Sequence, residues 1–222
     1  MVEIEISERM AVKNQIFLKM QDIFRLQNHD DINKVIQPQR EILEPVALAT
    51  FLAEIAFFHW SEHDHGKLSR PLLDESKQLF NIHRCLIHDA KDIAFCAMVN
   101  ILLARVDSDE QGFESCSEFL KEMFEQHSKN DQNVVVGDSL DPFDMTIGDI
   151  IVHYWHMCHM THAFMLHQLG KDDLQKGQEA IAVFRLCSTK EDEDPYHWDD
   201  VLVPSSNYRF YMHQRCGGQV SW

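Results

Sequence analysis

The stretch from Ile150 to Gly170 contains no Asp, Glu, Lys or Arg, and it places the strongest constraint on how this chain folds. A helix of that length would be long enough to span a lipid bilayer. The stretch also holds Thr161, Gln168 and five histidines, which are His153, His156, His159, His162 and His167. Polar side chains in that number are costly in lipid. The sequence therefore predicts a helix buried inside a bundle, with no insertion into a membrane.

Helical periodicity recurs along most of the chain. We expect helices over residues 7–29, 45–62, 69–105 with a break near 81–89, 107–129, 146–170 and 172–187. The polar residues 28–31 are expected to end the first helix, and Pro38 and Pro45 to bound short pieces. Only 8 glycines and 6 prolines occur, which disfavours turn-rich β folds.

These patterns predict an all-α protein. Residues 1–188 are expected to form an irregular bundle of about six or seven helices. Residues 189–222 are rich in aromatic side chains, which are uncommon in disordered segments. We therefore expect them to form an irregular C-terminal arm that packs on the bundle.

Acidic residues outnumber basic ones by 36 to 20, so the formal net charge is −16. Such a charge disfavours binding to nucleic acid through its phosphates and adsorption to anionic membranes. Residues 107–149 contain 12 acidic residues and only two lysines, Lys121 and Lys129. This concentration favours a basic protein partner.

Five glutamates in this segment recur every three or four residues, so they share one helical face: Glu110, Glu114, Glu118, Glu122 and Glu125. Like charges at this spacing repel by a few tenths of a kcal/mol per pair, roughly, and a basic surface would relieve that repulsion. We call these five glutamates the acidic stripe. This pattern predicts an interaction protein of inhibitor, immunity or regulatory type. A solvated outer face is the alternative interpretation.

Histidine is unusually frequent, with 14 residues, and supports a second hypothesis of a metal-dependent helical-bundle enzyme, a hydrolase or an oxidase. Iron, manganese or zinc is the cofactor that such a site implies. The candidate ligands fall in three groups and one isolated carboxylate: His59, Glu62 and His63; His88 and Asp89; Asp149, His153 and His156; and Glu54. Asp89 and Asp149 are equally suited to helix N-termini, and buried histidines often bond to neighbouring helices.

A third hypothesis is a pH-responsive structural subunit, because histidines that charge near pH 6 would offset most of the negative charge. The sequence contains no GxSxG, GxxxxGK[ST] or GxGxxG motif, so no local signature marks a nucleophile or a phosphate site. The six cysteines form no CxxC pair, and the acidic N-terminal segment lacks a signal-peptide pattern. These features predict a cytoplasmic protein with reduced thiols, and leave open whether it is an enzyme.

Overall fold

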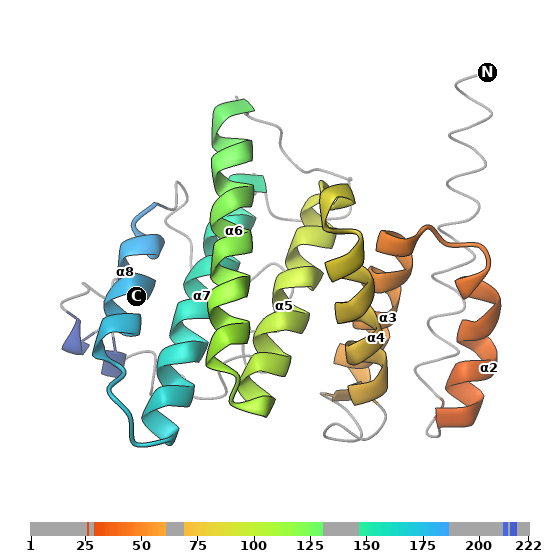
Figure 1. Cartoon of the computed structure of the whole chain (residues 1–222), viewed down its shortest axis with the longest axis horizontal. Helices are drawn as coiled ribbons and strands as arrows, with labels where there is room; N and C mark the ends of the chain where they lie inside the picture. Colours follow the sequence, from red (N-terminus) through yellow and green to blue (C-terminus); the bar gives the residue numbers. More distant parts are fainter. Residues whose placement is uncertain are drawn as a thin grey trace. The chain divides into compact units, whose positions relative to one another are not determined.

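The computed structural model describes residues 26, 29–60, 69–130, 147–186, 211–212 and 214–216, with residues 29 and 128–130 as backbone only. This part of the chain forms seven α-helices and one short 3-10 helix, and it contains no strand, which confirms the all-α prediction for these residues (Figure 1). The helices belong to two compact units, Met1–Leu86 and Ile87–Trp222. The bundle–arm boundary expected at residue 188 lies outside the described residues.

The first unit contains α2 (His29–Arg40), α3 (Pro45–His59) and α4 (Ser69–Ile82). Helix α3 packs on α4, and the Ser76 hydroxyl donates to the Ala49 carbonyl oxygen across this contact at 2.8 Å. The Arg40 guanidinium joins α2 to α4 through both oxygens of Glu75, at 2.9 and 2.6 Å. Planar two-point contacts of this kind fix orientation as well as charge pairing.

Helix α2 corrects the sequence-based expectation for residues 28–40. The polar residues Asp30 and Asp31 lie in its first turn, where carboxylates interact favourably with the helix dipole. Pro38 lies inside the helix near its end, where the loss of one backbone hydrogen bond disturbs few residues. The buried side chains of Ile32 and Ile36 outweigh that cost.

The break expected near residues 81–89 is confirmed. Helix α4 ends at Ile82, the 3-10 helix covers Arg84–Leu86, and α5 runs from Ala90 to Asp107. Asp89 begins α5 as its N-cap, since its Oδ1 accepts a hydrogen bond from the Lys91 backbone N–H at 2.8 Å. The structural role considered for Asp89 is therefore the observed one.

Replacing this cap gives a direct prediction. Asp89→Ala should lower the free energy of unfolding by about 1 kcal/mol, because the Lys91 N–H loses its acceptor. Asp89→Asn should cost far less, because an asparagine oxygen caps equally well. Thermal unfolding of the two variants measures the difference. Equal losses in both would mean that the charge of Asp89 matters more than its cap.

The second unit contains α5, α6 (Glu110–Asn130), α7 (Ile147–Gln168) and α8 (Leu174–Phe184). Helix α7 contacts α5, α6 and α8, and 16 of its 22 residues are buried. Contact with three neighbours leaves little of its surface for charged side chains, which explains the uncharged stretch in the sequence. The buried helix predicted there is confirmed. In the part of the chain that the structure describes, no helix is long and apolar enough to cross a membrane.

Short polar and glycine motifs set the ends of these helices. Asp109 Oδ1 accepts from the Gly112 N–H at 3.0 Å and caps α6, while Gly170, at φ +68°, follows the end of α7.

Of the predicted C-terminal arm, residues 211–212 and 214–216 are described. Met212 is fully buried against Gly177 of α8, where a side chain in place of the glycine hydrogen would collide with it.

Candidate functional site

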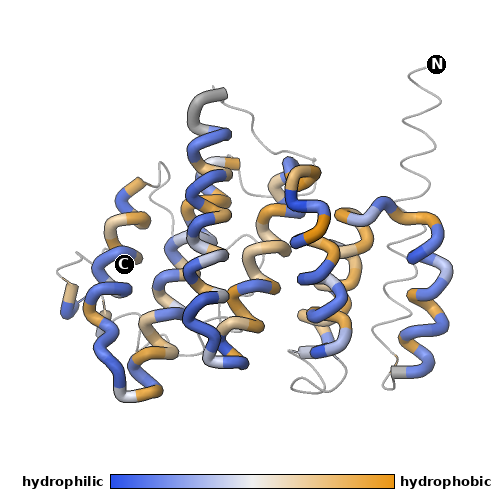
Figure 2. Tube along the Cα trace, in the orientation of Figure 1, coloured by the Kyte–Doolittle hydropathy of each residue, from blue (hydrophilic) through white to orange (hydrophobic). Residues whose placement is uncertain are grey.

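Helix α6 separates apolar and acidic side chains onto different faces. Phe113, Phe119, Leu120 and Met123 are buried in the second unit. The five glutamates of the predicted stripe are all exposed (Glu110, Glu114, Glu118, Glu122 and Glu125). Figure 2 shows this alternation as hydrophilic residues that recur along the length of α6. The predicted stripe therefore lies on the exposed face of an amphipathic helix.

Lysines at the end of α7 and on α8 contact the first two glutamates of the stripe. Lys171 forms an ion pair with Glu110. Lys176 lies between two helices, with its Nζ 2.6 Å from Glu114 Oε1 and 3.0 Å from Glu179 Oε2. The N-terminal half of the stripe therefore has a role inside the second unit, where it links α6 to α8.

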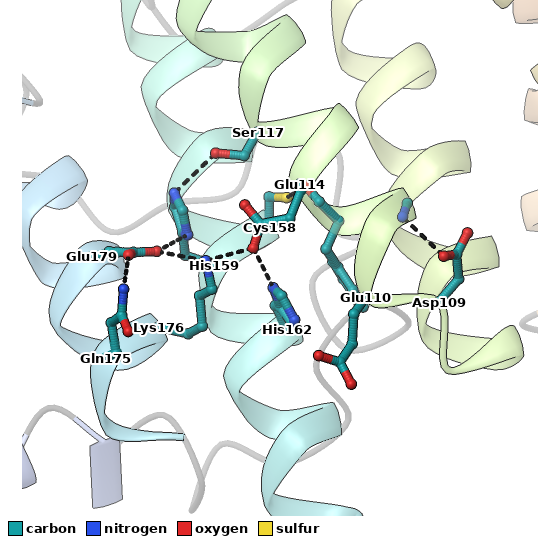
Figure 3. A network of polar contacts seen from close by, with 12 residues as sticks. Asp109, Glu110, Glu114, Ser117, Cys158, His159, His162, Gln175, Lys176 and Glu179 are labelled. Atoms are coloured by element: carbon teal, nitrogen blue, oxygen red, sulfur yellow. Dashed lines mark hydrogen bonds and ion pairs between the residues drawn. The ribbon is translucent and has the colours of Figure 1, made fainter. Parts of the chain in front are cut away.

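Next to Lys176, a chain of polar contacts crosses from α6 through α7 to α8 (Figure 3). Ser117 Oγ lies 3.1 Å from His159 Nε2, and His159 Nδ1 lies 3.2 Å from Glu179 Oε2. The indole N–H of Trp155 donates to Ser117 Oγ at 2.9 Å. We call Trp155, Ser117, His159 and Glu179 the polar relay.

Donor and acceptor chemistry fixes the direction of the polar relay. A carboxylate only accepts, so the His159 nitrogen that faces Glu179 must carry the imidazole proton. The opposite nitrogen is then an acceptor, and the Ser117 hydroxyl donates to it. The serine oxygen in turn accepts from Trp155. Every hydrogen therefore points along the series from Trp155 to Glu179.

Burial keeps the imidazole in this neutral form. The pKa of His159 falls to about 4, mainly because burial penalises the charged ring, with a further lowering by the ammonium of Lys176. Glu179 and Glu114 act in the opposite direction. Burial would raise the pKa of the Glu179 carboxyl, but its bond with Lys176 brings the pKa below the ordinary value. At neutral pH the relay is thus a neutral imidazole beside a charged carboxylate.

His162 lies one helical turn further along α7. Its ring stacks on Phe113, with centroids 4.7 Å apart and planes 8° from parallel, and its Nδ1 is 3.9 Å from Glu114 Oε1. Burial, followed by the charge of Lys176, lowers the pKa of His162. Both buried histidines therefore share Lys176 as a neighbour that opposes protonation.

This shared neighbour gives a testable consequence. Lys176→Met should raise the pKa values of His159 and His162, because it removes a positive charge while Glu114 and Glu179 remain. Titration of the imidazole resonances by NMR measures both values. Lys171→Met is the matched control, since Lys171 pairs with Glu110 and should leave His159 unchanged. Unaltered titration in Lys176→Met would contradict this electrostatic account.

The thiols next to the polar relay are poor nucleophiles. Contact with the Cys116 thiol, together with complete burial, raises the pKa of Cys158 well above its ordinary value. A thiol held in its protonated form is unreactive. Ser117, in contrast, has the neutral imidazole of His159 within hydrogen-bond distance, and this ring can act as a base.

The described members of the first two groups of candidate metal ligands, and Glu54, fall in different units. On α3, Glu54 is half-buried and His59 is fully buried, with its ring edge-on to Phe58. Glu62 and His63 lie outside the described residues. In the second unit, His88 is exposed and Asp89 is the N-cap of α5.

The remaining candidates lie on α7. Asp149 is buried in the first turn, and His153 is half-buried against Tyr154. His156 is buried and donates through Nδ1 to the Ala180 carbonyl oxygen of α8 at 2.9 Å. Within the described ranges, no three His, Cys, Asp or Glu side chains are grouped as a metal ion would require.

Sequence reasoning missed Ser117, Lys176 and Glu179, and it did not include His159 and His162 among the candidate ligands. Local spacing indicates part of this cluster. Glu114 and Ser117 are three residues apart and share a helical face, and the same holds for His159 and His162. Which faces meet depends on the packing of three helices. No protein-family model, curated protein or solved structure matches this chain.

Proposed function

We propose that this protein binds a basic protein partner through the acidic stripe of α6, formed by Glu110, Glu114, Glu118, Glu122 and Glu125. The exposure of these side chains on one face of α6 is the observation that supports the proposal. Glu110 and Glu114 also contact lysines of their own unit, and their carboxylates remain exposed.

Charge also favours such a partner. A net charge of −16 attracts basic surfaces at long range and repels nucleic acid and other acidic proteins. Carboxylates on a rigid helix present a fixed pattern, which adds specificity to that attraction. An inhibitor, immunity or regulatory protein would use a surface of this kind.

A photo-crosslinking amino acid placed at each of two exposed positions tests the proposal. Residue 126 lies next to Glu122 and Glu125 on α6, and residue 37 lies on α2 of the other unit. In cells that produce the protein, a basic partner should crosslink from position 126 and not from position 37. Equal crosslinking from both would show non-specific association.

Charge reversal of the stripe then measures its contribution. The double variant Glu118→Lys with Glu122→Lys should weaken binding of the crosslinked partner by at least about tenfold and reduce its salt dependence. The matched control is Glu41→Lys with Glu44→Lys, which makes the same charge change at exposed positions of the first unit. Isothermal titration calorimetry compares the three proteins. An unchanged dissociation constant for the stripe variant would disprove the docking role.

A further inference from the structure

Ser117, His159 and Glu179 stand in the order that an activated serine requires. A nucleophile needs a base within hydrogen-bond reach, and the base needs a third group that orients it. The two separations, 3.1 Å and 3.2 Å, satisfy both conditions. The three residues come from three helices of one unit, so no local sequence motif identifies them (Figure 3).

We propose that Ser117 is a nucleophile for acyl transfer, with His159 as its general base and Glu179 as the positioning residue that holds the imidazole. This activity is separate from partner docking, because neither Glu118 nor Glu122 belongs to the polar relay. Its substrates are small carboxylic esters.

The chemistry balances within the polar relay. Ser117 Oγ forms a bond to the ester carbonyl carbon while its proton passes to His159 Nε2. The ester C–O bond then breaks, and the leaving alcohol takes that proton. Water then bonds to the acyl carbon while the same nitrogen takes a proton from it. The bond from that carbon to Ser117 Oγ breaks, the proton returns to Oγ, and the carboxylic acid leaves.

Trp155 is the group placed to meet the negative oxygen of the intermediate. Backbone N–H groups in the middle of α6 are committed to the helix, so they are unavailable to that oxygen. The Trp155 N–H already donates to Ser117 Oγ at 2.9 Å, next to where the second oxygen of the tetrahedral carbon would form. One such donor predicts modest rates.

The surroundings select the kind of ester. Ser117 is half-buried, and the half-buried rings of Trp155 and Phe124 lie beside each other, with centroids 6.1 Å apart. Aromatic faces favour an apolar acyl group. Glu114 and Glu179 disfavour anionic substrates near the same helices.

An alkyl fluorophosphonate tests the nucleophile, because it phosphonylates activated serines. Incubation of the full chain should give one adduct, located at Ser117 by peptide mass mapping. Ser117→Ala should abolish it, while Ser115→Ala, which removes an exposed serine two residues away, should leave it intact. No adduct at Ser117 would overturn the proposal.

The roles of the other two residues are read from rates. His159→Gln should slow labelling by at least about 100-fold, and Glu179→Gln by about tenfold or more. Glu179 is partly exposed, so Glu179→Gln still tests whether the polar relay assists Ser117 if the variant at the buried His159 fails to fold. Equal labelling of Glu179→Gln and the unaltered protein would reduce the polar relay to a structural feature.

The pH profile separates an assisted serine from an unassisted one. Because the pKa of His159 is about 4, the base is already neutral at pH 6, and labelling by an assisted serine should be nearly constant from pH 6 to 8. An unassisted hydroxyl would react about tenfold faster for each pH unit, as its ionised fraction rises. A steep rise over this range would therefore contradict the proposal. Hydrolysis of 4-nitrophenyl acetate should follow the same profile.

Discussion

Phe113→Ala should lower the free energy of unfolding of the second unit by about 3–5 kcal/mol. Phe113 is 1% exposed and lies between α6 and α7, where its ring stacks on His162. Its removal deletes a large apolar contact and leaves a cavity that rigid helices fill poorly. The pKa of His162 should also rise, because burial is the main cause of its lowered value.

Hydrogen exchange of the α7 amides measures this loss in the second unit specifically, without averaging over the first unit. Phe184→Ala is the matched control, since that ring is 37% exposed and belongs to the same unit. Its cost should be about 1 kcal/mol or less. Similar losses in the two variants would mean that the α6–α7 contact is not the core of the unit.

Acidification from pH 6.5 to pH 4 should remove about 3 kcal/mol of stability through His159 alone. The unfolded chain protonates this residue near pH 6.5, whereas the folded protein protonates it near pH 4. Between these values the unfolded state binds more protons, so stability falls as the pH falls. Well below pH 4, where both states bind the proton, this residue contributes no further loss.

The charged neighbours of the imidazole set the size of this effect. Lys176 opposes protonation, while Glu114 and Glu179 favour it, and His162 adds a loss in the same direction. Urea unfolding at several pH values measures the slope. The slope of the free energy of unfolding against pH should become smaller in His159→Gln. It should stay unchanged in His88→Gln, which removes an exposed histidine of the same unit. An equal slope in all three proteins would contradict this origin, and the hypothesis of a pH-responsive subunit would lose its support.

The metal hypothesis illustrates a limit of helical spacing. Asp149, His153 and His156 share a face on a helical wheel, yet α7 is surrounded by three helices and His156 donates to the backbone of α8. Spacing shows which residues lie on one face of a helix. It does not show which neighbour that face meets, and coordination depends on that neighbour.

Sequence patterns were enough to predict the helical class, the break before α5, the buried character of α7 and the acidic face of α6. These features follow from periodicity, capping residues and burial of apolar side chains, which act over a few residues. Sequence patterns failed at α2, where burial of Ile32 and Ile36 outweighs the local preferences of polar residues and Pro38.

Helix packing, in contrast, determines which histidines contact polar side chains of other helices. His159 reaches Ser117 and Glu179 because α6, α7 and α8 pack in one particular register, and Lys176 reaches Glu114 for the same reason. These residues are tens of positions apart in the chain, so no local pattern encodes their contact. The fit of whole apolar faces sets how helices pack, and the contacts between polar side chains follow from that packing.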